Sequence, residues 1–383
     1  MNENSTANKA VKILFVSNTC WSIYNFRLDV IEYFISIGFE VHVAATTDDF
    51  AIRLVDIGCK LHDIKFNNRR LNPIEDLKLY FDLKRLYKKI KPSLIFHYVI
   101  KPNIYGSLAA SGLKIPSVAV ITGLGYAFAN KNWLSSFVIQ LYKIALKHVY
   151  KVWMLNEQDK QLFIQNKIVA AEKITVLQSE GINTQKFKSS INKQKNNVFI
   201  FLMATRMLWS KGVGLFAKAS EMLHKKGLIF ESQVIGFFEP GHPNSISLEQ
   251  FEDWKNRKIF TALGFSENVI PFFENADCFV LPTYYQEGVP RSLLEAGALQ
   301  MPAITTNNDG CTAVIKDGVN GFICQMNNAE DLAIKMERML NTSREDLHKM
   351  GTNGRQLVKE KFDIKFVLEK YAALIDELSL NIN

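Results

Sequence analysis

Short apolar runs recur along the chain and alternate with longer amphipathic stretches. The first half has four such runs, at 11–18, 39–46, 92–99 and 115–122. The second half has four more, at 198–206, 232–238, 277–282 and 302–308. Runs that are rich in Val and Ile and show no strict alternation are typical of parallel strands buried on both faces. The pattern therefore predicts an α/β architecture in both halves, with doubly wound sheets.

The spacing of these runs indicates two domains. A chain of 383 residues exceeds what one hydrophobic core usually serves. The stretch 189–197 is polar and has almost nothing to bury, so we expect the linker there. We predict a first domain over 1–190 and a second over 191–361, followed by a helical segment at 362–383.

Composition is that of a globular protein, with 48% apolar and 22% charged residues. The first ten residues are polar, and the apolar run that follows is too short for a membrane span or a signal-peptide core. We therefore expect a cytoplasmic location. The cysteines are odd in number, scattered and without a Cys-x-x-Cys pair, which favours free thiols over disulfides or a zinc site.

Positive charge is concentrated in the first half. Residues 1–190 hold 25 Lys and Arg against 15 Asp and Glu, whereas residues 191–383 hold 21 against 23. Two segments, 77–92 and 133–153, combine lysines with apolar residues and are predicted to be basic amphipathic helices. In the first, Leu77, Tyr80, Phe81 and Leu83 form the apolar stripe. Such helices can lie on anionic lipid, and the alternative is a solvated helix packed on a sheet.

The strongest chemical signal is a pair of glutamates at a loop-to-helix junction. Glu287 and Glu295 follow the strand at 277–282, and Pro290 is expected to be the first helical residue of a helix that runs to Gln300. Gly288 allows a ligand to approach the backbone, and the N–H groups from Val289 to Arg291 form an anion site. The spacing predicts a nucleotide-sugar site, with Glu287 on the sugar and Glu295 on the ribose.

A second signal follows the first strand of the second half. Arg206 and Lys211 lie just past the strand end, where open α/β sheets bind ligands. An arginine fork and a mobile lysine can together neutralise a leaving diphosphate. Each residue alone would be interpreted as a surface charge, but beside the glutamate pair both favour a phosphate site. The sequence has no Asp-x-Asp triplet and no histidine pair at metal-ligand spacing, so we expect neither metal nor cofactor.

The frame EGVPRSLLEA, with MPAITTNNDGCTAVIKDGVNGFIC after it, resembles the family 4 retaining glycosyltransferases. The resemblance implies the GT-B fold, in which two Rossmann-like doubly wound domains face a central cleft and the last helix, here 362–383, crosses back to the first domain. It also implies a UDP-sugar donor and retention of configuration. We expect front-side attack by the acceptor hydroxyl, because the sequence shows no obvious dedicated base. The family commonly continues from the second glutamate with Ala-x-Ala-x-Gly, and at the position of that glycine this chain has Gln300.

The first half is expected to bind the acceptor. It has no Gly-x-Gly-x-x-G after its first strand, which argues against a dinucleotide enzyme. Candidate acceptor or cleft residues at predicted strand ends are Asn18, His97, Lys101, Thr122 and Gly123. The alternative for His97 is a hydrogen-bonded histidine of the strand end. Together with the second-half motifs, the stretches HYVIKPNIYGSLAA and VITGLGYAF resemble the bacterial subgroup that extends polyprenyl-diphosphate-linked sugars in O-antigen, capsule and N-glycan precursor synthesis.

Together these observations predict transfer of a hexose or N-acetylhexosamine from a UDP-sugar to a polyprenyl-diphosphate-linked sugar. The predicted partners also include an anionic membrane surface, with the protein bound peripherally to the inner face of the cytoplasmic membrane. The alternative is another GT-B enzyme, either a sugar epimerase or a transferase with a soluble acceptor. A nucleic-acid partner is not expected, because the net charge of +8 is not accompanied by any binding motif.

Overall fold

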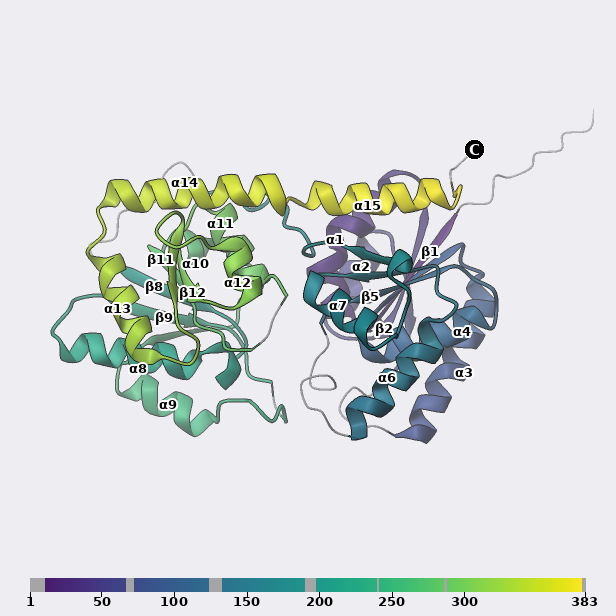
Figure 1. Ribbon diagram of the computed structural model, residues 1–383, viewed down its shortest axis with the longest axis horizontal. Coiled ribbons are helices and arrows are strands. Elements are labelled where there is room, and N and C mark those ends of the chain that lie inside the picture. Colours follow the sequence, from purple (N-terminus) through teal and green to yellow (C-terminus); the bar gives the residue numbers. More distant parts are fainter. Residues whose placement is uncertain are drawn as a thin grey trace, which may run out of the picture. The chain divides into compact units, whose positions relative to one another are not determined.

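The computed structural model describes residues 11–66, 72–123, 133–189, 198–239, 241–285 and 288–380. The chain forms two compact units (Figure 1). The first comprises Met1–Glu180 together with Lys365–Asn383, and the second comprises Gly181–Ile364. Of the predicted linker at 189–197, only its first residue is among those described.

The first unit is built on a seven-stranded parallel sheet in the order β3-β2-β1-β4-β5-β6-β7. Its strands are β1 Lys12–Thr19, β2 Glu40–Thr46, β3 Lys60–Asp63, β4 Leu94–Tyr98, β5 Ser117–Ile121, β6 Lys151–Met154 and β7 Ile174–Val176. Its helices are α1 Cys20–Ser36, α2 Ala51–Asp56, α3 Pro73–Ile90, α4 Ser107–Ser111, α6 Trp133–Leu146, α7 Glu157–Gln165 and α15 Ile364–Glu377, with a π-helix η1 at Pro102–Gly106 and a 3-10 turn η2 at Ala171–Lys173.

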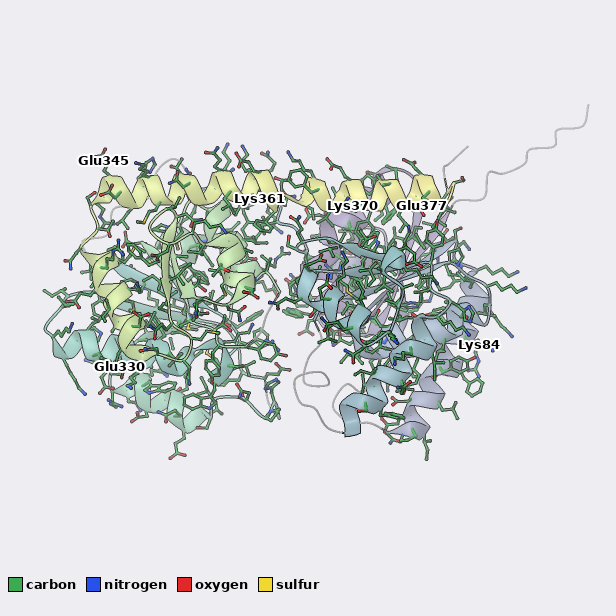
Figure 2. All side chains as sticks on the ribbon, viewed as in Figure 1. Lys84, Glu330, Glu345, Lys361, Lys370 and Glu377 are labelled. Carbon is green, nitrogen blue, oxygen red and sulfur yellow. The ribbon has the colours of Figure 1, made fainter. Side chains whose placement is uncertain are left out.

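Helix α15, at the C-terminal end of the chain, packs on the first sheet through Tyr371. The ring of Tyr371 lies 4.9 Å from that of Phe96 and 4.7 Å from that of Trp153, measured between centroids. Its hydroxyl is 2.8 Å from that of Tyr98, so the one polar atom of a buried ring has a partner. Glu377, which Figure 2 labels near the end of the helix, accepts a hydrogen bond from the Tyr150 hydroxyl at 2.8 Å.

The second unit repeats this architecture with a six-stranded parallel sheet in the order β10-β9-β8-β11-β12-β13. Its strands are β8 Ile200–Ala204, β9 Glu231–Ile235, β10 Thr261–Gly264, β11 Cys278–Leu281, β12 Ala303–Thr306 and β13 Gly321–Cys324. Its helices are α8 Val213–Lys225, α9 Leu248–Asn256, α10 Ile270–Glu274, α11 Arg291–Ala298, α12 Asp309–Val314, α13 Ala329–Leu340 and α14 Arg344–Lys361, with a 3-10 turn η3 at Trp209–Lys211. The prediction of two doubly wound Rossmann-like sheets is confirmed.

Two sequence-based helix assignments differ from the structure, one in the extent of the helix and the other in its buried face. The segment 133–153 is not one helix, because α6 ends at Leu146 and Lys151 begins β6. On α3, the predicted apolar stripe is not the face that packs on the sheet. Of its four members only Leu83 is buried, whereas Leu77 and Phe81 are 57% and 53% exposed. The buried face of α3 is shifted round the helix to Leu79, Leu83, Tyr87 and Ile90.

All five cysteines are free and buried, two in the first unit and three in the second. Burial disfavours the thiolate and raises the pKa of Cys59 and of Cys324 to about 12. The thiols are therefore inert side chains of the two cores. In the described part of the chain, no helix is both long enough and apolar enough to cross a membrane.

Candidate active site

The second sheet changes winding direction at β8, whose neighbours are β9 and β11. At such a switch point the loops after the adjacent strands separate and leave a crevice for ligands. The loop after β8 carries Arg206 and Lys211, and the loop after β11 leads into α11. The sheet order therefore brings the two sequence signals to one edge, although they are some eighty residues apart.

The Ser210 carbonyl joins these two loops. It accepts hydrogen bonds from the Tyr284 backbone N–H at 3.0 Å and from the Thr283 hydroxyl at 3.0 Å. On the other side of the β8 loop, Asn244 accepts from the Ser210 N–H at 2.6 Å. Lys211 is thus attached to a segment that is held from both sides, so its position is fixed by the backbone.

Side chains of β12 and of the residues after it donate hydrogen bonds to the end of β11 and to the loop that follows β11. The Thr306 hydroxyl donates to the Thr283 carbonyl at 2.6 Å, and the Thr305 hydroxyl donates to the Leu281 carbonyl at 2.8 Å. Asn308 donates from its side-chain amide to the Tyr285 carbonyl at 2.6 Å. Both threonines are fully buried. Sequence reasoning missed these supports, although the polar run TTNN at the end of an apolar strand was a usable signal.

Gly212 lets helix α8 begin directly against the β11 loop. Its φ is +83°, and a Cβ atom there would lie 2.2 Å from the Pro282 carbonyl oxygen. No other residue fits without moving backbone. The close approach places Lys211 beside the segment that leads to α11.

Arg206 has a partner that the sequence did not reveal. Its Nη1 lies 2.8 Å from Oε2 of Glu239, in the loop after β9. Both side chains are partly exposed, at 42% and 34%, so the pair is solvated and contributes little to stability. A phosphate group that approaches this edge of the sheet can therefore displace Glu239 and bind the Arg206 guanidinium.

Helix α11 differs in its ends from the prediction. Pro290 is the N-cap rather than the first helical residue, and the helix ends at Ala298 rather than Gln300. The early end has a clear cause, because the N–H groups of Gln300 and Met301 bond back to the carbonyls of Gly297 and Ala296. Gln300 adopts φ +57°, the left-handed conformation that glycine takes more readily.

Glu295 lies on the second turn of α11 and is mostly buried, with a side chain 14% exposed. Arg291 donates from Nε to Glu295 Oε1 at 3.1 Å. Burial outweighs this contact and raises the pKa of Glu295. In its ionised form, this mostly buried carboxylate is stabilised by hydrogen-bond donors, and it can accept hydrogen bonds from ligand hydroxyls. Gly288 and Val289 precede the helix half-buried, whereas Glu287 lies outside the described residues.

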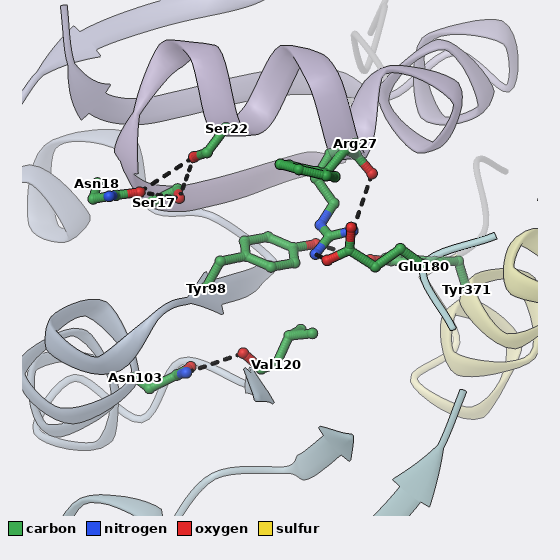
Figure 3. Close-up of polar contacts among 10 residues, drawn as sticks. Ser17, Asn18, Ser22, Arg27, Tyr98, Asn103, Val120, Glu180 and Tyr371 are labelled. Atoms are coloured by element: carbon green, nitrogen blue, oxygen red, sulfur yellow. Dashed lines mark hydrogen bonds and ion pairs between the residues drawn. The ribbon is translucent and has the colours of Figure 1, made fainter. Parts of the chain in front are cut away.

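In the first sheet the switch point lies between β1 and β4. Asn18 stands near the end of β1, where its Oδ1 accepts from the hydroxyls of Ser17 at 3.2 Å and Ser22 at 3.3 Å (Figure 3). At the end of β5, Thr122 is half-buried and Gly123 is exposed with φ +152°. These three predicted residues therefore lie at the carboxyl edge of the sheet.

His97 and Lys101 do not have the surroundings of substrate contacts. His97 is fully buried, with Nε2 2.9 Å from the Tyr87 hydroxyl and Nδ1 3.2 Å from the Ser107 hydroxyl. Burial lowers the pKa of His97 to about 3, so the ring is neutral. The structure thus favours the alternative of a hydrogen-bonded core histidine. Lys101, 8% exposed, contacts Asp76 at 2.6 Å.

A buried ion pair that sequence reasoning missed anchors the end of the first unit. Arg27 on α1 contacts Glu180 Oε1 at 2.6 Å, and its guanidinium lies 4.4 Å above the ring of Tyr98 (Figure 3). Burial opposes the charge of Arg27, but Glu180 together with the Tyr98 and Tyr371 hydroxyls outweighs this cost, and the pKa of Arg27 is raised. Glu180 immediately precedes Gly181, where the second unit begins. The pair therefore fixes the chain at the unit boundary.

Two family models match the chain. The model of glycosyl transferases group 1 matches residues 183–357, and the glycosyl transferase 4-like model matches residues 12–156. The N,N'-diacetylbacillosaminyl-diphospho-undecaprenol alpha-1,3-N-acetylgalactosaminyltransferase of Campylobacter jejuni is 30% identical, over 97% of this chain and 100% of the relative.

The chain belongs to the group 1 glycosyltransferases.

Further comparisons agree with membership of this glycosyltransferase family. The UDP-Gal:alpha-D-GlcNAc-diphosphoundecaprenol alpha-1,3-galactosyltransferase of Escherichia coli is 27% identical, over 82% of each chain. Among solved structures, Anabaena HepE in complex with UDP and glucose has a TM-score of 0.80 at 16% identity, covering 96% of this chain and 99% of HepE. A glycosyltransferase from Rickettsia africae has a TM-score of 0.78 at 20% identity, covering 97% and 100%. These two structures support the GT-B fold.

In this glycosyltransferase, the group 1 match contains both loops of the second switch point. The described residues include no group of three or more His, Cys, Asp or Glu side chains placed to hold a metal ion. The described residues of the two loops and the start of α11 include the cations Arg206, Lys211 and Arg291, and the N-terminal end of α11 adds a positive backbone dipole.

Proposed function

We propose that this glycosyltransferase moves a hexose or N-acetylhexosamine from a UDP-sugar to a polyprenyl-diphosphate-linked sugar, with retention of configuration. The observation that carries the proposal is the hydrogen-bonded junction at Ser210, which fixes the Lys211 loop against the loop that leads to α11. The names of both relatives describe transfer to sugars on diphosphoundecaprenol, and one of them specifies a UDP-linked donor.

The chemistry requires negative charge to develop on the leaving diphosphate. Groups already in place for that charge need no reorganisation during the reaction, which makes them the largest expected catalytic contribution. Lys211, Arg206 and the start of α11 supply it in this proposal. Glu295 accepts hydrogen bonds from the ribose, and Glu287 orients the donor sugar. The acceptor hydroxyl attacks from the side of the leaving group, whose phosphate takes the proton.

The test is a screen of UDP- and GDP-sugars against polyprenyl-diphosphate-linked acceptors, read by mass spectrometry. We expect one UDP-sugar to add a single sugar mass, and only when the acceptor is present. Conversion of the donor without an acceptor would instead identify an epimerase.

EDTA should leave the rate of transfer unchanged, because side chains and backbone dipoles neutralise the diphosphate. Loss of activity in EDTA that Mg²⁺ restores would refute the metal-free mechanism.

We further propose that α3 brings the first unit to an anionic membrane surface. Ile74, Leu77 and Phe81 are 81%, 57% and 53% exposed and recur at helical spacing. The same helix carries the cations Lys84, Arg85 and Lys88, of which Figure 2 labels Lys84. An exposed apolar stripe flanked by cations is the pattern of helices that lie in a headgroup layer.

Replacing Leu77 and Phe81 together by serine is expected to weaken binding to vesicles that contain phosphatidylglycerol at least about tenfold, because two inserted side chains are lost. The matched control replaces Ile229 and Leu248 by serine, since these are 84% and 65% exposed in the second unit. Sedimentation with vesicles measures both. Equal binding by the two double variants would mean that the α3 stripe does not insert.

A further inference from the structure

The loop that follows β9 lies along the segment that carries both candidate phosphate ligands. The Met207 N–H donates to the Phe237 carbonyl at 3.0 Å, and the Ile246 N–H donates to the Met207 carbonyl at 3.0 Å. Met207 lies between Arg206 and Lys211 in the chain. The loop after β9 therefore guides the backbone from one cation to the other.

Asn244 in this loop caps the 3-10 turn η3, which ends at Lys211. The first hydrogen bond of the turn itself is that of the Lys211 N–H, 3.2 Å from the Leu208 carbonyl. The two N–H groups before it both bond to Asn244. Trp209 donates to the Asn244 carbonyl at 2.9 Å, and Ser210 donates to its Oδ1 at 2.6 Å. A single residue of another loop thus satisfies the donors at the start of the turn.

Side-chain packing anchors the beginning of the same turn. The Trp209 ring lies 5.7 Å from that of Trp254 on α9, measured between centroids. On α8, a Cβ atom at Gly214 would lie 2.5 Å from the Trp209 ring, so the absence of a side chain there lets the ring lie on the helix. Packing therefore fixes where the turn starts, and the bonds to Asn244 fix its direction toward Lys211.

Asn244 is itself held by the earlier part of the loop. Its N–H donates to His242 Nδ1 at 3.1 Å, and the His242 N–H donates to the Glu239 carbonyl at 3.1 Å. The Glu239 carboxylate is the partner of Arg206. The loop therefore connects the counter-ion of one cation with the cap of the turn that carries the other.

We propose that Asn244 is a positioning residue for glycosyl transfer and acts through Lys211. The inference rests on the proposed function, because it takes Lys211 as the cation that meets the donor diphosphate. Asn244 acts without contacting the donor, since its Oδ1 holds the Ser210 N–H and thereby sets the direction in which the Lys211 side chain leaves the turn. A displacement of about 1 Å in a group that stabilises the transition state can lower the rate about 100-fold.

The test is a double-mutant cycle in the full-length protein. Asn244→Leu removes the acceptor at nearly constant volume, and it is made both alone and together with Lys211→Ala. Asn244→Asp keeps an oxygen within reach of the Ser210 N–H. Calorimetry measures the affinity for UDP, and turnover is measured with the UDP-sugar that the screen described above selects.

We expect Asn244→Leu to weaken UDP binding at least about fivefold and to lower turnover at least about tenfold, whereas Asn244→Asp should change each less than about threefold. In the Lys211→Ala background, Asn244→Leu should change either quantity less than about twofold, because the effects of residues that act as a unit are not additive. Equal fold losses in the two backgrounds would overturn the positioning role, as would an aspartate variant that is as impaired as the leucine variant.

The matched control is Asn320→Leu, at the opposite edge of the same sheet. Asn320 immediately precedes β13, and its Oδ1 accepts the Lys316 N–H at 2.6 Å, the same length as the bond that Ser210 makes to Asn244. Below its melting transition, followed by circular dichroism, this variant should keep UDP affinity and turnover within about twofold of the wild type, because the lost bond is remote from Lys211. A loss equal to that of Asn244→Leu would mean that stability alone is responsible and would overturn the inference.

The two readouts separate this inference from the proposed function. Coupling of Asn244 to Lys211 in UDP binding, without sugar transfer by the wild type, would refute the proposed function and support the positioning role. Transfer by the wild type with an additive cycle would refute the positioning role alone. A wild type that does not bind UDP would refute both.

Discussion

Lys211→Ala is expected to lower turnover at least about 100-fold while leaving the fold intact, because it removes a fixed positive charge at the developing diphosphate. The backbone of the loop is held by Ser210, whose contacts do not involve the lysine side chain. The rate constants should be measured with donor and acceptor both varied. A loss confined to kcat would place the interaction in the transition state.

The matched control is Lys218→Ala, which removes the same charge from the exposed surface of α8, where Lys218 contacts Glu330 at 2.7 Å. It should change turnover less than about twofold, since an exposed pair contributes little.

Glu287→Gln is expected to lower turnover at least about 100-fold as well, because the donor sugar loses the carboxylate that orients it. Near-normal rates in both Lys211→Ala and Glu287→Gln would remove this edge of the sheet from the mechanism.

The first unit is expected to lose stability as the pH falls below 6.5, because His97 is buried as a neutral ring. Burial lowers the pKa of His97 to about 3, whereas the unfolded side chain titrates near 6.5. Below pH 6.5 the unfolded state therefore binds a proton that the folded state does not. The stability is fully present above 6.5 and falls by up to about 1.4 kcal/mol per pH unit as the pH approaches 3.

Thermal unfolding at several pH values measures this slope. His97→Gln should keep a hydrogen bond to Tyr87 or Ser107 and remove the titration. Between pH 6.5 and 4.5 the variant should therefore lose about 2 kcal/mol less stability than the wild type. His62→Gln should flatten the curve by a smaller amount, since the pKa of His62, lowered by burial, is about 4 and its ring is half-exposed. Parallel curves for wild type and His97→Gln would contradict the prediction.

Long apolar strands were predictable from sequence, and short edge strands were not. The runs that became β1, β4, β8 and β11 are central and buried, so their composition alone identifies them. Strands β3 and β10 are edges whose residues are half-buried or exposed, and the local pattern gives no apolar run. The end of α6 was missed because its apolar residues continue almost without interruption into β6.

The positions of candidate site residues in the fold were predictable where these residues follow strands, but their hydrogen-bond and ion-pair partners were not. Arg206 and Lys211 could be located because parallel strands place their ends at one edge. Glu239, the partner of Arg206, and Glu180, the partner of Arg27, are 33 and 153 residues away in sequence. Such pairs leave no local signature. The hydrogen bonds of buried His97 likewise come from residues of α3 and α4, which no strand pattern contains.

The buried thiols give each unit an internal reporter of its own opening. Cys20 and Cys59 lie in the first unit, and Cys278, Cys311 and Cys324 lie in the second. A thiol that is buried and protonated reacts with an alkylating reagent only after the structure around it opens. Because the two sets fall in separate units, peptide-resolved alkylation can follow two local unfolding reactions in one unmodified chain. The relative stability of the two units can thus be measured without cutting them apart.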